Sequence, residues 1–239
     1  MSIAGFDATA GAGILADIKT FEQLKVYGLG VISANTFQTD CEVRRVQWIS
    51  IEDIIEQIDM LISKFSVNYF KFGILNDSNS FDVIRDFILK KNSKAKIIWD
   101  PVLHSSSGFS FFNQGNESIS SILKGIYLIT PNEHEFQALF KSEQYALELS
   151  YQTYIYLKGG HRLNNVGEDV LYAKGNCYTL LPNQSGIVYP KHGSGCIMAA
   201  AITAYLALGF TVDIACDKAK RYIEGVLTSN SSLLGWHSI

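Results

Sequence analysis

Short apolar segments alternate with amphipathic segments along most of the chain, and this alternation restricts the fold more than any other feature. Residues 51–65 and 80–91 repeat apolar side chains at helical spacing, whereas residues 68–75 and 95–102 are short and rich in β-branched and aromatic residues. Strands separated by helices of this length are typical of βαβ units, whose parallel strands form a sheet covered on both faces. We therefore expect an α/β fold with a mostly parallel central sheet.

The same alternation continues to the end of the chain. Residues 169–182 resemble a β-hairpin that turns at Gly175 and Asn176, and two final helices are expected over residues 195–208 and 212–229. No low-complexity linker interrupts the pattern. We therefore expect one domain over residues 1–239.

Composition excludes several classes of function. The formal net charge is −3 and the basic residues are scattered, so a basic face for nucleic acid or an acidic membrane is not expected. Apolar stretches are too short to span a membrane, and the first residues do not form a signal peptide. The four cysteines, Cys41, Cys177, Cys196 and Cys216, form no CxxC pair, which argues against a zinc site and indicates reduced thiols in a cytoplasmic protein.

Polar residues collect where the expected strands end, and ligands of open α/β sheets bind at those ends. Asp7 is either a helix N-cap or a site residue, and Asp100 is either a turn residue before Pro101 or a site residue. Asn132 and Glu135 form either a helix capping box or a pair that orders the waters of Mg²⁺ beside phosphates.

Asp17 differs from these residues because it lies within an expected helix, over residues 14–28. Its spacing from Ile14 and Phe21 places the carboxylate on the apolar face of that helix. A carboxylate near the core needs a partner. Asp17 therefore either pairs with a cation that the sequence does not identify or contacts a polar ligand.

The segment "HGSGC" at residues 192–196 opens a long apolar helix. A glycine turn at a helix N-terminus offers backbone N–H groups and the positive end of the helix dipole, which together suit a phosphate. Neither a Walker motif nor a dinucleotide fingerprint is present. A phosphate site in this chain would therefore belong to another group of kinases.

Taken together, these segments resemble the ribokinase superfamily and, within it, the hydroxymethylpyrimidine/phosphomethylpyrimidine kinases of thiamin biosynthesis. The resemblance is carried by "SIAGFDATAGAGILADIKTF", "VISANTFQ", "DPV", "TPNEHE", "LKGGH" and "HGSGC", in that order. It implies a three-layer α/β/α fold that uses ATP and Mg²⁺. It also implies phosphorylation of 4-amino-5-hydroxymethyl-2-methylpyrimidine and then of its monophosphate, by a protein that is commonly a homodimer.

The resemblance also assigns residues to the site. The pyrimidine-binding positions match Gly5, Asp17 and Gln38; the nucleotide side matches Lys158, Asn132 and Glu135; the metal positions, mostly through water, match Asp100 and Glu135; and the anion hole matches Gly193, Ser194 and Gly195. Cys196 falls at the position of the catalytic base. A thiol at a helix N-terminus is expected to have a lowered pKa, although a passing phosphate would oppose that effect.

Two alternatives remain open at this point. Pyridoxal kinases share the fold and the cysteine and act on a similar hydroxymethyl group, and Phe6 stands where relatives more often have serine, which affects the expected shape of the substrate pocket. A catalytically silent binding protein is the alternative from another class. It would require a lost motif, but Asp17, Asn132, Lys158 and Cys196 are all present.

Overall fold

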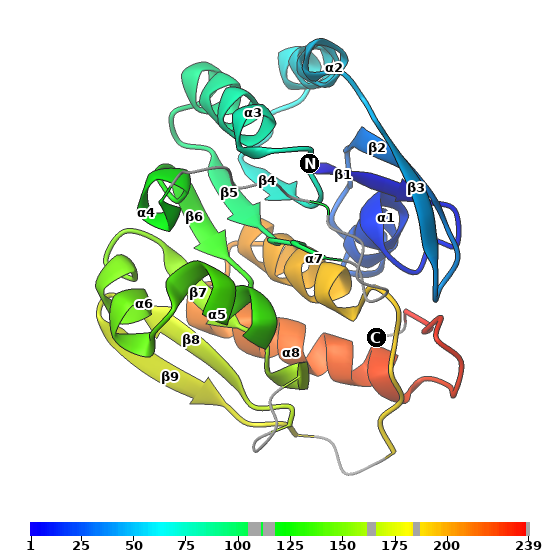
Figure 1. Cartoon of the computed structure of the whole chain (residues 1–239), viewed down its shortest axis with the longest axis vertical. Coiled ribbons are helices and arrows are strands. Elements are labelled where there is room, and N and C mark those ends of the chain that lie inside the picture. Colours follow the sequence, from blue (N-terminus) through cyan, green and yellow to red (C-terminus); the bar gives the residue numbers. More distant parts are fainter. Residues whose placement is uncertain (105–110, 112–117, 162–165, 184–186, 238–239) are drawn as a thin grey trace.

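One continuous β-sheet runs through the molecule (Figure 1). The structure, a computed structural model, describes residues 1–104, 111, 118–161, 166–183 and 187–237. Within these residues the strand order is β3-β2-β1-β4-β5-β6-β7-β8-β9. The strands are β1 (Ser2–Asp7), β2 (Gly30–Gln38), β3 (Val43–Trp48), β4 (Tyr69–Phe72), β5 (Lys96–Trp99), β6 (Ile126–Ile129), β7 (Tyr154–Leu157), β8 (Asp169–Ala173) and β9 (Asn176–Leu180). Strands β2, β1, β4, β5, β6 and β7 are mutually parallel, whereas β3, β8 and β9 join as antiparallel strands at the edges.

Helices cover both faces of this sheet. One layer contains α2 (Ile51–Lys64), α3 (Ser78–Lys91), α4 (Ile119–Ile122), α5 (Glu133–Phe140) and α6 (Glu143–Leu149). The other contains α1 (Gly13–Gln23), α7 (Ser194–Ala207) and α8 (Val212–Thr228). A short 3₁₀ helix, η1 (Gly159–His161), follows β7. The expected three-layer α/β/α fold with a mostly parallel sheet is confirmed.

Strand β5 shows how the sequence produces two separate cores. Ile97 and Trp99 pack with the layer that contains α3, whereas Ile98, between them, packs with the layer that contains α7. All three side chains are buried. Successive side chains of a strand point to opposite faces, so a continuous apolar run fits a strand that is covered on both sides.

Several element boundaries differ from those expected. The hairpin turns at Lys174 and Gly175, one residue earlier than predicted, and both residues have positive φ, as a type I′ turn requires. Helix α1 ends at Gln23 rather than near Gly28, because the chain takes a left-handed conformation at Lys25. Strand β3 and helix α6 were not predicted. In the described part of the chain, no helix is long and apolar enough to cross a membrane.

Candidate active site

The carboxyl ends of the parallel strands meet at one edge of the sheet, next to the N-terminus of α7. Asp7 ends β1, Gln38 ends β2, Asp100 follows β5, and Lys158 follows β7. Parallel pairing brings these ends into one row. The prediction that strand ends would assemble polar groups therefore agrees with the topology of the sheet.

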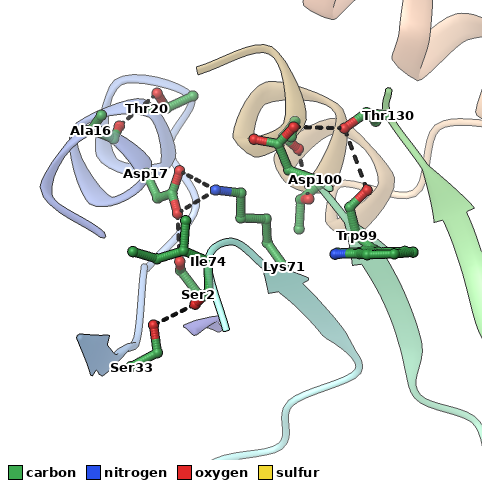
Figure 2. Close-up of polar contacts among 12 residues, drawn as sticks. Ser2, Ala16, Asp17, Thr20, Ser33, Lys71, Ile74, Trp99, Asp100 and Thr130 are labelled. Carbon is green, nitrogen blue, oxygen red and sulfur yellow. Dashed lines mark hydrogen bonds and ion pairs between the residues drawn. The ribbon is translucent and has the colours of Figure 1, made fainter. Parts of the chain in front are cut away.

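Lys158 lies in this row of strand ends, close to two carboxyl groups. Its Nζ lies 2.7 Å from Asp100 Oδ1 and 4.0 Å from Glu135 Oε2. Thr130 Oγ1 donates to the same Asp100 oxygen at 3.3 Å (Figure 2). Asp100 thus faces the site instead of serving only the turn before Pro101.

The pKa values of the two carboxyl groups beside Lys158 are shifted in opposite directions. Burial raises the pKa of Glu135 to about 7, because attraction to Lys158 offsets only part of the desolvation and Asp100 adds repulsion. Burial also acts to raise the pKa of Asp100, but attraction to Lys158 and then to Lys71 prevails and lowers it. Asp100 is therefore a carboxylate at neutral pH, while Glu135 titrates near neutrality.

The donor set suits a magnesium ion that keeps most of its water. Asp100 Oδ2 is buried and has no hydrogen-bond partner among the described residues, and the Glu135 carboxyl also lies near Lys158, with Oε2 4.0 Å from Nζ. Carboxylate oxygens are the ligands that Mg²⁺ prefers, usually one or two together with waters and phosphates. No group of three His, Cys, Asp or Glu residues in the described chain could hold a metal by itself.

Asn132 and Glu135 form the capping box that their spacing predicts. Asn132 Oδ1 accepts from the Glu135 N–H at 2.9 Å, and Glu135 Oε2 accepts from the Asn132 N–H at 2.7 Å. The same Glu135 oxygen is the one nearest Lys158. The box therefore begins α5 and also fixes a carboxyl group at the edge of the row.

The turn before Cys196 is built for close backbone contact. Gly193 is the N-cap of α7, has φ +73°, and lies so close to the glycine loop after β1, residues 8–13, that a Cβ would be 2.1 Å from Gly11 O. A Cβ on Gly195 would be 3.0 Å from Lys158 Nζ. No side-chain hydrogen bond caps α7. The first turn of α7, including Ser194, thus directs its N-terminal dipole at the space beside the Lys158 ammonium.

Cys196 lies at the end of this turn, but its pKa is shifted in the direction opposite to the expected one. The residue is partly exposed, yet burial of the thiol raises its pKa to about 12; attraction to Lys71 offsets only part of this, and repulsion from Asp100 and Asp17 adds to it. A hydrogen bond with the Gly13 backbone acts in the lowering direction. The expected lowering of the pKa is therefore wrong for the protein without ligands, because desolvation outweighs the helix terminus.

Asp17 is paired with a cation, which decides between the two alternatives for its partner. Its oxygens lie 3.0 and 2.9 Å from Lys71 Nζ and accept a 2.5 Å hydrogen bond from Ser2 Oγ (Figure 2). Both charged side chains are completely buried. Burial raises the pKa of Asp17. Burial acts to lower the pKa of Lys71, but attraction to Asp17 prevails and raises it.

The other two expected pyrimidine-binding residues lie near this pair and toward the edge of the sheet. Gly5 is inside β1, and a Cβ there would lie 2.5 Å from Ile74 Cδ1. Ile74 stands beside Asp17 in Figure 2, and its carbonyl accepts from Ser33 Oγ at 2.6 Å. Gln38 is half-buried at the end of β2. Ile74 thus separates Gly5 from open space, while Gln38 is accessible.

Sequence reasoning missed the partners of the predicted residues. Lys71 was read only as part of a strand, although a lysine between Phe70 and Phe72 is an unusual residue for a buried position. Asp7 is not the N-cap of α1, a place taken by Ala12. Its carboxylate contacts His192 instead, 185 residues away. No local pattern could have identified that partner.

The chain matches one family of known proteins over nearly its full length. A family model described as phosphomethylpyrimidine kinase matches residues 7–238. The chain is 31% identical over 247 residues to a hydroxymethylpyrimidine/phosphomethylpyrimidine kinase of Aquifex aeolicus, covering 98% of this chain and 96% of that one. It is 30% identical to the corresponding kinase of Rhizobium meliloti, covering 98% of this chain and 91% of that one.

Solved structures give the same picture. A crystal structure of phosphomethylpyrimidine kinase from Clostridium difficile 630 has a TM-score of 0.78 at 28% identity and covers 93% of this chain and 96% of its own. The ADP complex of Bacillus subtilis pyridoxal kinase has a TM-score of 0.77 at 25% identity and covers 95% and 91%. The fold is therefore shared by kinases of both substrates.

Proposed function

Because this chain belongs to the phosphomethylpyrimidine kinase family, we propose that it is an ATP-dependent phosphotransferase of 4-amino-5-hydroxymethyl-2-methylpyrimidine. In this proposal it phosphorylates the hydroxymethyl group and then converts the monophosphate to the diphosphate used in thiamin biosynthesis. One observation carries the proposal. Lys158, Asp100 and Glu135 converge at a single edge of the sheet with the glycine turn that precedes Cys196.

Each group has a role that follows from its position. Phosphoryl transfer depends mainly on positioning and on stabilising charge. The N–H groups of the Gly193–Gly195 turn and the Lys158 ammonium would hold the transferring phosphate. Mg²⁺, when bound, neutralises phosphate charge; Asp100 and Glu135 would hold it, mostly through water, with Asn132 orienting Glu135.

The alcohol would lie on the other side of the turn. Gln38 is accessible and suits the polar edge of an aminopyrimidine. Gly5 has no side chain, so Ile74 can pack directly on its backbone, and Gly5 would support the pocket through Ile74. Asp17 is fully covered and paired with Lys71, so we assign it to supporting the pocket from below rather than to direct contact. Phe6 is half-buried beside Gly5 in β1 and would shape the same pocket.

Cys196 is the proposed acceptor of the hydroxyl proton. With a pKa of about 12 in the free protein it is a thiol at neutral pH, so the reactive thiolate fraction would increase about tenfold per pH unit. Catalysis that uses this thiolate would therefore give a kcat/KM that rises from pH 7 to pH 10 without a plateau. The nearby positive charge of Lys71 favours the thiolate.

A competition assay tests the proposal. The protein is mixed with ATP, Mg²⁺ and equal concentrations of the aminopyrimidine alcohol and pyridoxal, and both phosphorylated products are quantified by mass spectrometry. We expect the pyrimidine monophosphate first and its diphosphate later, and a kcat about 10²- to 10⁴-fold lower for Cys196→Ala with little change in KM.

The possible outcomes separate the parts of the proposal. Preferential formation of pyridoxal phosphate would assign the chain to the alternative substrate, and no transfer to either alcohol would indicate a silent binding protein. A Cys196→Ala variant within a few-fold of the parent would reject the proton-acceptor role and leave the substrate assignment intact. We also propose a cytoplasmic homodimer, supported by the free cysteines of the described chain for its compartment and by family resemblance for its assembly; light scattering would test the mass.

A further inference from the structure

The Asp7 carboxylate is buried at the end of β1 but has no capacity left for a ligand. Its oxygens accept hydrogen bonds from the Thr9 N–H and the Ala12 N–H, each at 2.9 Å, and from Thr9 Oγ1 at 2.9 Å. His192 Nε2 lies 2.8 Å from Asp7 Oδ2. A carboxylate has about four acceptor positions, and four donors occupy them here.

The protonation of this pair follows from its chemistry. Burial acts to raise the pKa of Asp7, but the hydrogen bonds from His192 and Thr9 prevail and lower it. Asp7 is therefore a carboxylate and can only accept, which means that the hydrogen atom in the 2.8 Å contact belongs to His192 Nε2. The Asp7 side chain is 1% exposed and the His192 side chain 14%, so water competes little for the hydrogen bond between them.

The pair joins two glycine segments that are distant in sequence. Asp7 holds residues 8–12 through the Thr9 and Ala12 amides, and His192 immediately precedes the anion-hole turn. The segments are in close contact, because a Cβ on Gly11 would lie 2.7 Å from His192 Cδ2. The His192 N–H also donates to Leu233 O at 2.9 Å, which fixes the backbone from the other side.

We propose that Asp7 and His192 are a positioning pair that sets the anion-hole turn in register with the glycine loop of residues 8–13. This inference rests on the proposed function only in taking residues 193–195 as the phosphate-binding turn. Misplacing a catalytic group by about 1 Å can reduce turnover about 10²-fold. Loss of the pair should therefore reduce kcat for both phosphorylation steps, whereas the KM for ATP should stay nearly unchanged.

Four variants test the pair. We expect His192→Ala and Asp7→Asn each to reduce kcat by about 10- to 100-fold, with the KM for ATP within about threefold. His192→Gln should recover most of kcat, because its amide nitrogen can donate a comparable bond. The double variant Asp7→Asn/His192→Ala should be no slower than the slower single variant, because each single change already breaks the contact between Asp7 and His192.

Hydrogen exchange gives a readout that does not need turnover. Peptides covering residues 8–13 and 192–196 should exchange faster in His192→Ala than in the parent or in His192→Gln. Ser50→Ala is the matched control, since it removes the N-cap bond of α2 to the Asp53 amide and lowers stability without touching either loop. Its kcat and its loop exchange should equal those of the parent.

Several results would overturn the positioning role. These are a normal kcat in His192→Ala, additive losses in the double variant, or a lowered melting temperature without faster exchange in either loop. A parent protein that transfers no phosphate would reject the proposed function, while the exchange experiment would still decide whether Asp7 and His192 order the two loops.

Discussion

Lys71 places a positive charge in the interior of the molecule, between the helix that carries Asp17 and the strand that precedes Asp100 (Figure 2). An ion that is removed from water is tolerated only when its partner is close and well oriented. The two short contacts to Asp17 meet that requirement. At the scale of single residues, this pair is the strongest constraint on the floor of the proposed pocket.

Removing one member of the pair should be more damaging than removing both charges. We expect Lys71→Met to lower the free energy of unfolding by about 3–5 kcal/mol, because the buried Asp17 carboxylate loses its counterion. The double variant Asp17→Asn/Lys71→Met should recover most of that loss. Urea denaturation at pH 7 measures both values. A double variant as unstable as Lys71→Met would show that the lysine acts through packing rather than charge.

The same residues show the limit of sequence reasoning at this scale. The spacing of Asp17 from Ile14 and Phe21 correctly placed it near the core and indicated a need for a partner. Lys71 could not be identified as that partner, because only the sheet brings β4 next to α1 and β1. The prediction of a lowered pKa for Cys196 was wrong for a related reason: burial depends on all the elements around a residue, not on its own helix alone.

At the scale of elements, α5 shows how one residue serves both a helix and a site. Glu135 completes the capping box with Asn132, and its carboxyl group also lies 4.0 Å from the Lys158 ammonium in the site. Its pKa is about 7 in the folded protein and near 4.5 when unfolded. A carboxylic acid whose pKa is higher in the folded state favours folding most strongly at pH values below its pKa in the unfolded state. That contribution is lost as pH rises toward 7, and it is constant above.

The Glu135→Gln variant should lose this pH dependence. In the parent, Glu135 alone should make the free energy of unfolding about 3 kcal/mol lower at pH 8 than at pH 4, and the glutamine side chain should abolish that difference while keeping the capping box. Urea denaturation across this range measures the change. Glu133→Gln removes a charge from the same first turn and controls for the helix dipole. An unchanged difference in Glu135→Gln would contradict the raised pKa.

Elements were predictable where burial leaves a periodic pattern. The apolar pattern of residues 51–65 predicted the bounds of α2 to within one residue, and the capping-box pattern predicted the start of α5. Strand β3 was missed because it is an edge strand with two arginines and no fully buried residue, so it has no apolar alternation to detect. The early end of α1 was missed because Lys25, not a glycine, adopts the left-handed conformation.

At the scale of the whole molecule, the sheet joins all parts of the chain. Apolar cores lie on both of its faces, and strands β1 to β7 contribute to one or both, with the exception of the edge strand β3. The alternating pattern predicted this architecture because βαβ units have few ways to fold. The edge addition at β3 was beyond it because that strand has no fully buried residue, and the contact between residues 7 and 192 was beyond it because it joins distant parts of the chain.

We propose that the chain is one cooperative unit, as its uninterrupted pattern predicts. Unfolding should then show a single transition, with circular dichroism and tryptophan fluorescence giving the same midpoint. Trp99 reports on the centre of the sheet, Trp48 on the β3 edge, and Trp236 on the C-terminal segment. Separate midpoints for the two signals would divide the chain into independently folding parts.

The contact between Asp7 and His192 has a consequence for the growing chain on the ribosome. Strand β1 and its glycine loop are synthesised first, and His192, just before α7, follows 185 residues after Asp7. Domains form as their segments leave the ribosome, in order from the N-terminus. A nascent chain that stops before residue 190 contains Gln38, Asp100 and Lys158 but has neither the proposed anion hole nor the histidine that aligns it. The proposed phosphate transfer is thus withheld until synthesis is nearly complete.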